Sequence, residues 1–147
     1  MHHPKKIFVT VGIAIVICAL LWYFRPLPLS NLTKDNSTLL ITEIELGVKD
    51  GKAYNNSTDY GTLSDVQKNE ILDLLENYSY KRTFGTLFSN GSLQGFGKVL
   101  HIFVYENDDF RNIISISETD GLLINDKAYK IQDGAGLIQK ITEILAP

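Results

Sequence analysis

Residues Ile7–Phe24 form a stretch without charge or proline, and Thr10 is its one ordinary polar side chain. A helix rises about 1.5 Å per residue, so this stretch would reach roughly 27 Å, close to the ~30 Å hydrocarbon core of a bilayer. Backbone groups in lipid must find their hydrogen bonds within the helix. The stretch therefore predicts a transmembrane anchor at residues 7–24, preceded by a short tip at residues 1–6.

The residues at either end of this stretch predict its orientation. Lys5 and Lys6 precede it, and cationic flanks stay on the cytoplasmic side of a membrane. Trp22 and Tyr23 lie at the other end, where aromatic rings favour the headgroup level. Arg25 opposes this orientation with a single charge. We therefore expect a single-pass protein of the cell membrane, with a cytoplasmic N-terminus and an extracytoplasmic C-terminal domain.

A cleaved signal peptide is the alternative interpretation of the same stretch. The apolar run is longer than the roughly 7–15 residues of a signal core, and no small-x-small cleavage site follows it. The next residues, Arg25-Pro26-Leu27-Pro28, suit signal peptidase poorly. The favoured interpretation is thus an uncleaved signal anchor.

Small side chains recur every fourth residue along the predicted anchor, at Thr10, Ala14 and Cys18. Such a stripe lets two membrane helices approach closely, so it would permit a weak homodimer. Small residues are also common in membrane helices that do not associate, which gives the stripe a second explanation.

The charge of residues 30–147 excludes one class of partner. All 17 acidic residues of the chain lie there, with all but three of its 14 basic residues. An acidic surface repels phosphate backbones, so we expect no nucleic-acid partner. The one cysteine, Cys18, lies in the predicted anchor, and the rest of the chain therefore has no disulfide and no thiol chemistry.

Residues 25–37 have the composition of a linker, and residues 38–147 that of one extracytoplasmic domain. Pro26 and Pro28 stiffen the linker. Residues 39–49 alternate as a half-buried strand does, and the face expected to be buried carries Leu40, Thr42, Ile44, Leu46 and Val48. After the turn signal Asp50-Gly51, the polar residues 52–61 predict a loop.

Further strands are expected at residues 80–88, 98–106 and 110–118, and Asn125-Asp126-Lys127 predicts the turn of a last hairpin. Residues 98–106 are apolar on both faces, which is typical of a central strand covered on both sides. The glycine-rich residues 89–97 predict a loop.

Two helices complete the predicted domain. Ser64 begins a capping-box pattern, and apolar residues then follow at helical spacing as far as Tyr78. Asp133 is the expected cap of the second helix, whose apolar stripe is Leu137, Ile138, Ile141, Ile144 and Leu145. The predicted fold class is α+β: a transmembrane helix, then a two-layer domain with an antiparallel sheet of about five strands and two helices, in the order strand, helix, strand meander, helix.

No catalytic motif stands out in the sequence. His101 lies in a predicted strand among apolar residues, which favours a packed histidine over a catalytic one. Residues 106–109 (Glu-Asn-Asp-Asp) offer oxygen ligands, but they lack the spacing of a calcium loop and are typical of a β-turn. We therefore expect no catalytic residues, no cofactor and no metal.

Three aromatic residues are interleaved with glycines between residues 84 and 97: Phe84, Phe88 and Phe96. Aromatic side chains on a glycine-rich loop can form a partner-binding edge. They can equally anchor the loop on the core. The sequence leaves both interpretations open.

The chain resembles the small, uncharacterised membrane-anchored proteins of low-GC Gram-positive bacteria, which are known as domain-of-unknown-function families. The resemblance lies in the Lys5-Lys6 tip with its apolar stretch, and in the ending ISISETDGLLINDKAYKIQDGAGLIQKITEIL from Ile114. The order of elements is also similar to that of PepSY-like and cystatin-like modules. The resemblance implies no catalytic residues, and a shared fold does not determine function.

Three functions agree with these features. The first is a non-enzymatic module that binds a protein, a peptide or a cell-wall component outside the membrane. The second is a cell-wall or peptide-processing enzyme without a recognisable motif. The third is an immunity protein that protects its own cell at the membrane.

Overall fold

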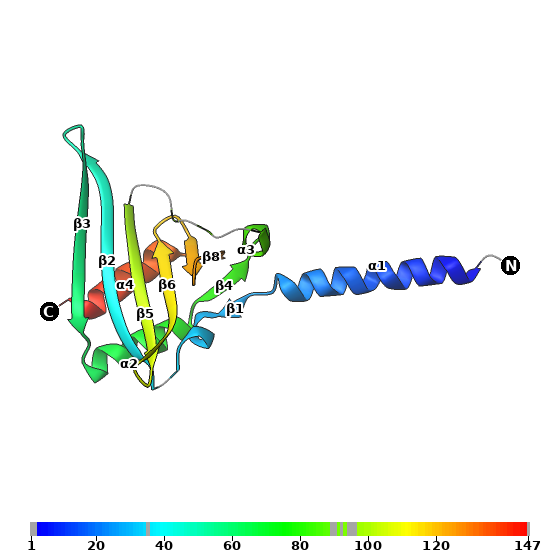
Figure 1. The fold of residues 1–147 in the computed structure, drawn as a ribbon, viewed down its shortest axis with the longest axis horizontal. Coiled ribbons are helices and arrows are strands. Elements are labelled where there is room, and N and C mark those ends of the chain that lie inside the picture. Colours follow the sequence, from blue (N-terminus) through cyan, green and yellow to red (C-terminus); the bar gives the residue numbers. More distant parts are fainter. Residues whose placement is uncertain (1–2, 35, 89–90, 92, 94–96, 147) are drawn as a thin grey trace.

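A computed structural model of the chain describes residues 3–34, 36–88, 91, 93 and 97–146. Its helices are α1 (His3–Tyr23), the 3₁₀ helix η1 (Leu29–Leu32), α2 (Asp65–Glu76), α3 (Phe84–Phe88) and α4 (Gly134–Leu145). Its strands are β1 (Leu27–Pro28), β2 (Thr38–Lys49), β3 (Lys52–Thr62), β4 (Ser79–Arg82), β5 (Gly97–Glu106), β6 (Asp109–Ser117), β7 (Gly121–Ile124) and β8 (Lys127–Ile131). They form one antiparallel sheet in the order β1-β4-β8-β7-β6-β5-β2-β3 (Figure 1).

The predicted fold is wrong in its count and order of elements. Eight strands and four α-helices are present in the described chain, instead of about five strands and two helices beside an anchor. Residues 52–61, expected to be a loop, belong to the long strand β3. Residues 80–88, expected to be one strand, divide into the end of β4 and the short helix α3.

The predicted transmembrane anchor at Ile7–Phe24 is also contradicted. α1 projects away from the sheet (Figure 1). No helix in the described part of the chain is both long and apolar enough to cross a membrane. This finding contradicts the predicted single-pass topology, signal anchor and membrane localisation.

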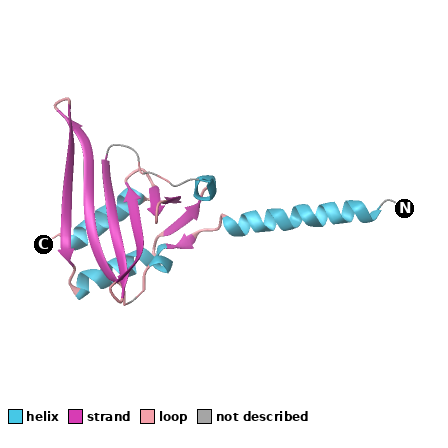
Figure 2. Cartoon of the chain, viewed as in Figure 1, coloured by secondary structure: helices cyan, strands magenta, loops and turns pink. Residues whose placement is uncertain are grey.

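The core lies between one face of the sheet and the helices α2 and α4, which cover that face (Figure 2). Ile71 and Leu75 point from α2 into this layer, and α4 contributes most of its predicted stripe. Across the sheet the core residues are Leu39, Ile41, Tyr80, Leu100, Ile102, Val104, Ile114, Ile116, Leu122, Ile124 and Ile131. Helices α2 and α4 therefore share one hydrophobic core with the face of the sheet that they cover.

The buried face of β2 is the opposite of the predicted one. Leu39 and Ile41 lie in the core, whereas Leu40 and Val48 are exposed. Apolar residues stand on both faces of this strand, so its pattern does not determine which face the helices cover. The contacts with α2 and α4 decide it.

Likewise, β5 is covered by helices on one face only. Leu100, Ile102 and Val104 are buried under the helix layer. His101, Phe103 and Tyr105 point to the other face of the sheet, where they remain half-buried. The expectation that both faces of this strand are covered is thus wrong.

Part of the segment predicted as a linker belongs to the core. β1 pairs with β4, and the N–H of Leu29 donates to the carbonyl oxygen of Tyr78 at 2.9 Å. The Leu29 side chain is completely buried.

The predicted helix cap and turns are present in the structure. The capping box is present at Ser64, where the side chain and backbone of Ser64 and Gln67 bond reciprocally. The predicted turn residues Asp50, Asn125 and Asp126 all have positive φ, as does Gly51. Such pairs close two-residue hairpins, because their twist matches that of the flanking strands. These predictions are confirmed.

Candidate functional site

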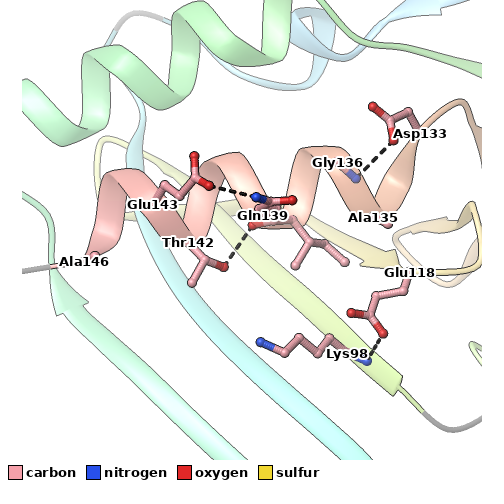
Figure 3. A pocket seen from close by; sticks show the side chains of 10 residues that line it. Lys98, Glu118, Asp133, Ala135, Gly136, Gln139, Thr142, Glu143 and Ala146 are labelled. Atoms are coloured by element: carbon pink, nitrogen blue, oxygen red, sulfur yellow. Dashed lines mark hydrogen bonds between the residues drawn. The ribbon is translucent and has the colours of Figure 1, made fainter.

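A hollow of about 680 Å³ lies beside α4, over the part of the sheet that the helices leave uncovered (Figure 3). We call it the α4 hollow. It is open to the surface, and its volume is in the range of about 300–1,000 Å³ that is usual for ligand sites. Its lining residues are Lys98, Glu118, Asp133, Ala135, Gly136, Ile138, Gln139, Thr142, Glu143 and Ala146.

The residues at the start of α4 determine which side of the helix faces the α4 hollow. Asp133 adopts the left-handed conformation (φ 59°), and its carboxylate accepts the N–H of Gly136 at 3.1 Å. The N–H of Gly134 donates to Asp120 at 2.7 Å, which fixes the helix start to the preceding turn. Because the apolar stripe of α4 faces the core, the side chains of Ala135 and the polar residues beyond it line the hollow.

A buried carboxylate joins α4 to the sheet at the edge of the hollow. Glu43 of β2 is only 8 % exposed, and its Oε1 lies 3.1 Å from the ammonium of Lys98 on β5. Its Oε2 accepts the hydroxyl of Thr142 on α4 at 3.1 Å. This carboxylate raises the pKa of Lys98 above its ordinary value, chiefly by accepting a hydrogen bond from it. A buried charge that is paired and hydrogen-bonded in this way fixes the position of α4 over β2.

Tyr60 of β3 lies close to Glu43 and Thr142. Burial raises its pKa, and the negative charge of Glu43 raises it further, while a hydrogen bond with Thr142 acts in the opposite direction. The C-terminal end of α4 therefore lies over β3, the edge strand of the sheet, as Figures 1 and 3 also show.

The α4 hollow has a negative character. Glu118, Asp133 and Glu143 line it against one cation, Lys98. The charge of Lys98 is already balanced by Glu43, which stands outside the lining set. Within the part of the chain that the structure describes, the three carboxylates accept hydrogen bonds from neutral backbone or amide donors, at 2.9–3.1 Å. Apolar surface from Ala135, Ile138 and Ala146 lies among them.

The β2–β3 hairpin extends past α4 and carries a second, smaller hollow near its turn, with a volume of about 380 Å³. Lys49, Lys52, Ala53, Tyr54 and Asn56 line it. The Tyr54 hydroxyl donates to Glu45 at 3.0 Å. This smaller hollow therefore lies on the hairpin that ends the sheet, whereas the α4 hollow is lined by α4 and by residues near the start of β5 and the end of β6.

His101 lies on the face of the sheet opposite to the α4 hollow. Its Nδ1 is 2.8 Å from the hydroxyl of Ser115 on β6, and the two residues are cross-strand partners. Burial lowers the pKa of His101 below its ordinary value. Ser115 is only 4 % exposed, so its hydroxyl is closed to a substrate. The geometry agrees with the packed histidine that the sequence favours.

The acidic turn at residues 106–109 serves the β5–β6 hairpin. Asn107 and Asp108 have positive φ, and Glu106 forms ion pairs with Lys34 (2.6 Å) and Arg111 (3.2 Å). Among the residues that the structure describes, no group of three or more acidic, histidine or cysteine side chains is placed to hold a metal ion.

The aromatic residues predicted to bind a partner are only partly brought together. Phe84 and Phe88 stand at the two ends of α3, 69 % and 82 % exposed. The ring of Phe84 packs edge-on against Phe24 at the end of α1, with centroids 5.1 Å apart. Phe96 lies outside the described residues. Partner binding through these residues, like a homodimer through Thr10, Ala14 and Cys18, stays a prediction.

The residues of the α4 hollow were not recognised as a site in the sequence. Lys98, Glu118 and Glu143 are far apart in the chain and carry no motif. The Asp50-Gly51 turn was the signal that could have revealed β3, because a two-residue turn after a strand predicts a second strand paired to the first. The polar side chains of residues 52–61 favoured the prediction of a loop over that of a second strand.

Comparisons of the chain with protein-family models, with curated proteins and with solved structures gave no match. The resemblance to anchored Gram-positive proteins thus remains an expectation.

Proposed function

We propose that this protein is a non-enzymatic interaction module that binds a segment of another protein in the α4 hollow. The observation that carries the proposal is the hollow itself: an open site of about 680 Å³ with apolar surface and three carboxylates in its lining. Its ten lining residues include no histidine, cysteine or serine. The absence of these common nucleophiles favours binding over nucleophilic catalysis.

The groups around the hollow also favour a binding role. Glu43, Lys98 and Thr142 are held to one another, so the wall is fixed before a partner arrives. A preformed wall lowers the entropy that a partner must lose. A peptide-processing enzyme is the alternative, and the same experiment distinguishes the two.

The test is a selection of random peptides displayed on phage against the full chain. A mild detergent keeps the protein in solution, since α1 exposes apolar side chains. Ala135→Trp places an indole in the hollow, whereas Asn69→Trp adds the same ring to an exposed position on α2. We expect selected peptides to bind the parent and Asn69→Trp, and to lose binding to Ala135→Trp.

Two outcomes would overturn the proposal. One is that no peptide is enriched, or that both tryptophan variants bind equally well. The other is that mass spectrometry finds the peptides cleaved after incubation, which would make the chain an enzyme.

A further inference from the structure

The edge of the sheet beside the α4 hollow is open. β3 is the last strand of the sheet and is eleven residues long, and most of its residues are exposed. The opposite edge is β1, which is only two residues long. An edge strand presents a row of unpaired N–H and C=O groups that another strand can join. β3 is therefore the one long edge in the described sheet.

The turn of the hairpin determines which backbone groups face outward. Asp50 and Gly51 both have positive φ and form a two-residue turn, so Lys49 and Lys52 are the hydrogen-bonded pair that closes the hairpin. Such pairs alternate along an antiparallel ladder. The intervening residues of β3 direct their N–H and C=O groups away from β2. These residues are Ala53, Asn55, Ser57 and Asp59.

Natural sheets protect their edges with charges, prolines, bulges or short strands. The middle of β3, Ala53–Thr58, has no charge and no proline. The irregularity in its pairing with β2 lies beyond this stretch, opposite Leu40–Thr42, and Gly61 adopts positive φ there. The middle of the edge is thus unprotected for six residues.

We infer that an extended segment of a partner protein binds by adding a strand to the free edge of β3. This rests on the proposed function and gives its binding mode. Main-chain bonds to β3 supply affinity, and side chains on one face of the added strand point toward the α4 hollow. The C-terminal end of α4, whose residues Thr142, Glu143 and Ala146 line the hollow, lies beside β3 (Figure 1).

The α4 hollow also indicates which side chain enters it. Its apolar surface suits an aliphatic stem, and its three carboxylates, which outnumber its one lysine, suit a cation at the tip. A lysine or arginine of the added strand satisfies both conditions. A second copy of β3 would offer Tyr54, Asn56 and Thr58 on this face in its unprotected part, none of them basic, so a partner segment with a basic residue is the better occupant.

Ser57→Pro in the full chain tests strand addition, with Ser57→Ala as its matched control. Proline removes an outward N–H and is tolerated in edge strands, while alanine keeps the N–H and removes only the hydroxyl. For the selected peptides we expect Ser57→Pro to weaken binding about tenfold or more, the loss expected for one or two main-chain bonds. Ser57→Ala should bind like the parent. Circular dichroism of each variant confirms that the sheet is retained.

A second experiment tests the basic side chain of the bound peptide. The lysine or arginine is replaced by norleucine, and the affinity of both peptides is measured for the parent protein and for Glu143→Gln. We expect the exchange to weaken binding to the parent more than to the variant, because the variant has lost one of the carboxylates that attract the cation. If the exchange weakens binding to both proteins equally, the inference that a basic side chain enters the hollow is overturned.

Failure of the binding mode can be told apart from failure of the proposed function. If Ala135→Trp abolishes binding while Ser57→Pro and Ser57→Ala bind equally, the hollow binds its partner without strand addition, and the inference is overturned. If neither Ala135→Trp nor Ser57→Pro has an effect, both are overturned. Analytical ultracentrifugation tests for a second copy of the chain at this edge. A dimer that Ser57→Pro dissociates would identify a second copy as the occupant and would overturn the inference that a partner segment binds there.

Discussion

The ring of Tyr54 lies over Gly47, its cross-strand neighbour in the β2–β3 hairpin. A side chain at position 47 would collide with the outer atoms of the ring, so the absence of a side chain there lets the hydroxyl reach Glu45. That hydrogen bond is the main reason why the pKa of Tyr54 is raised above its ordinary value.

Gly47→Ala should therefore lower the pKa of Tyr54 toward its ordinary value of 10.0. The new methyl group displaces the ring and breaks the bond that holds the phenolic proton. NMR titration of chains with ¹³C-labelled tyrosine measures the change, and Tyr54→Phe identifies the resonance. A pKa that stays the same in Gly47→Ala would show that the ring does not depend on this glycine.

Leu29→Ala should destabilise the domain by about 2–5 kcal/mol, because it leaves a cavity in the core. Leu29 is completely buried although it lies in a segment with the composition of a linker. Asn31→Ala, two residues later and exposed, is the control and should change the free energy of unfolding by less than about 0.5 kcal/mol. Denaturant unfolding measures both. Equal stabilities would mean that η1 is not part of the folded unit.

Ile141→Ala should also cost about 2–5 kcal/mol of unfolding free energy. Ile141 lies completely buried in the middle of the apolar stripe of α4. A helix of this length does not form alone in water and depends on this packing. Gln139→Ala on the exposed side of α4 serves as the control. If Ile141→Ala melts like the parent, the stripe must be a docking face and not core.

The stability of the domain should fall as the pH falls below about 6.5, the ordinary pKa of histidine. Burial lowers the pKa of His101 in the folded state, so below that pH the unfolded chain binds the proton more readily. The stabilisation is present above the unfolded pKa and is lost as the pH falls through the folded one. Unfolding at pH 7.5 and pH 5.5 measures the difference, and His101→Gln should reduce it. The same pH dependence in parent and variant would assign it to other groups.

The sequence determined those features that a few neighbouring residues control. The capping box at Ser64, the cap at Asp133 and the turns at Asp50-Gly51 and Asn125-Asp126 all formed as predicted, because each depends on φ preferences and hydrogen bonds within one turn of chain. The stripe of α4 was also predictable, since its apolar residues recur with the helical period.

Only the tertiary structure decided the rest. The buried face of β2, the existence of β3 and the burial of Leu29 depend on partners that lie far along the chain. The junction beside the α4 hollow is the clearest case, because Thr142 and Glu43 meet across 99 residues of sequence. No local pattern records such a contact, since the free energy that favours it arises only after helix and sheet have packed together.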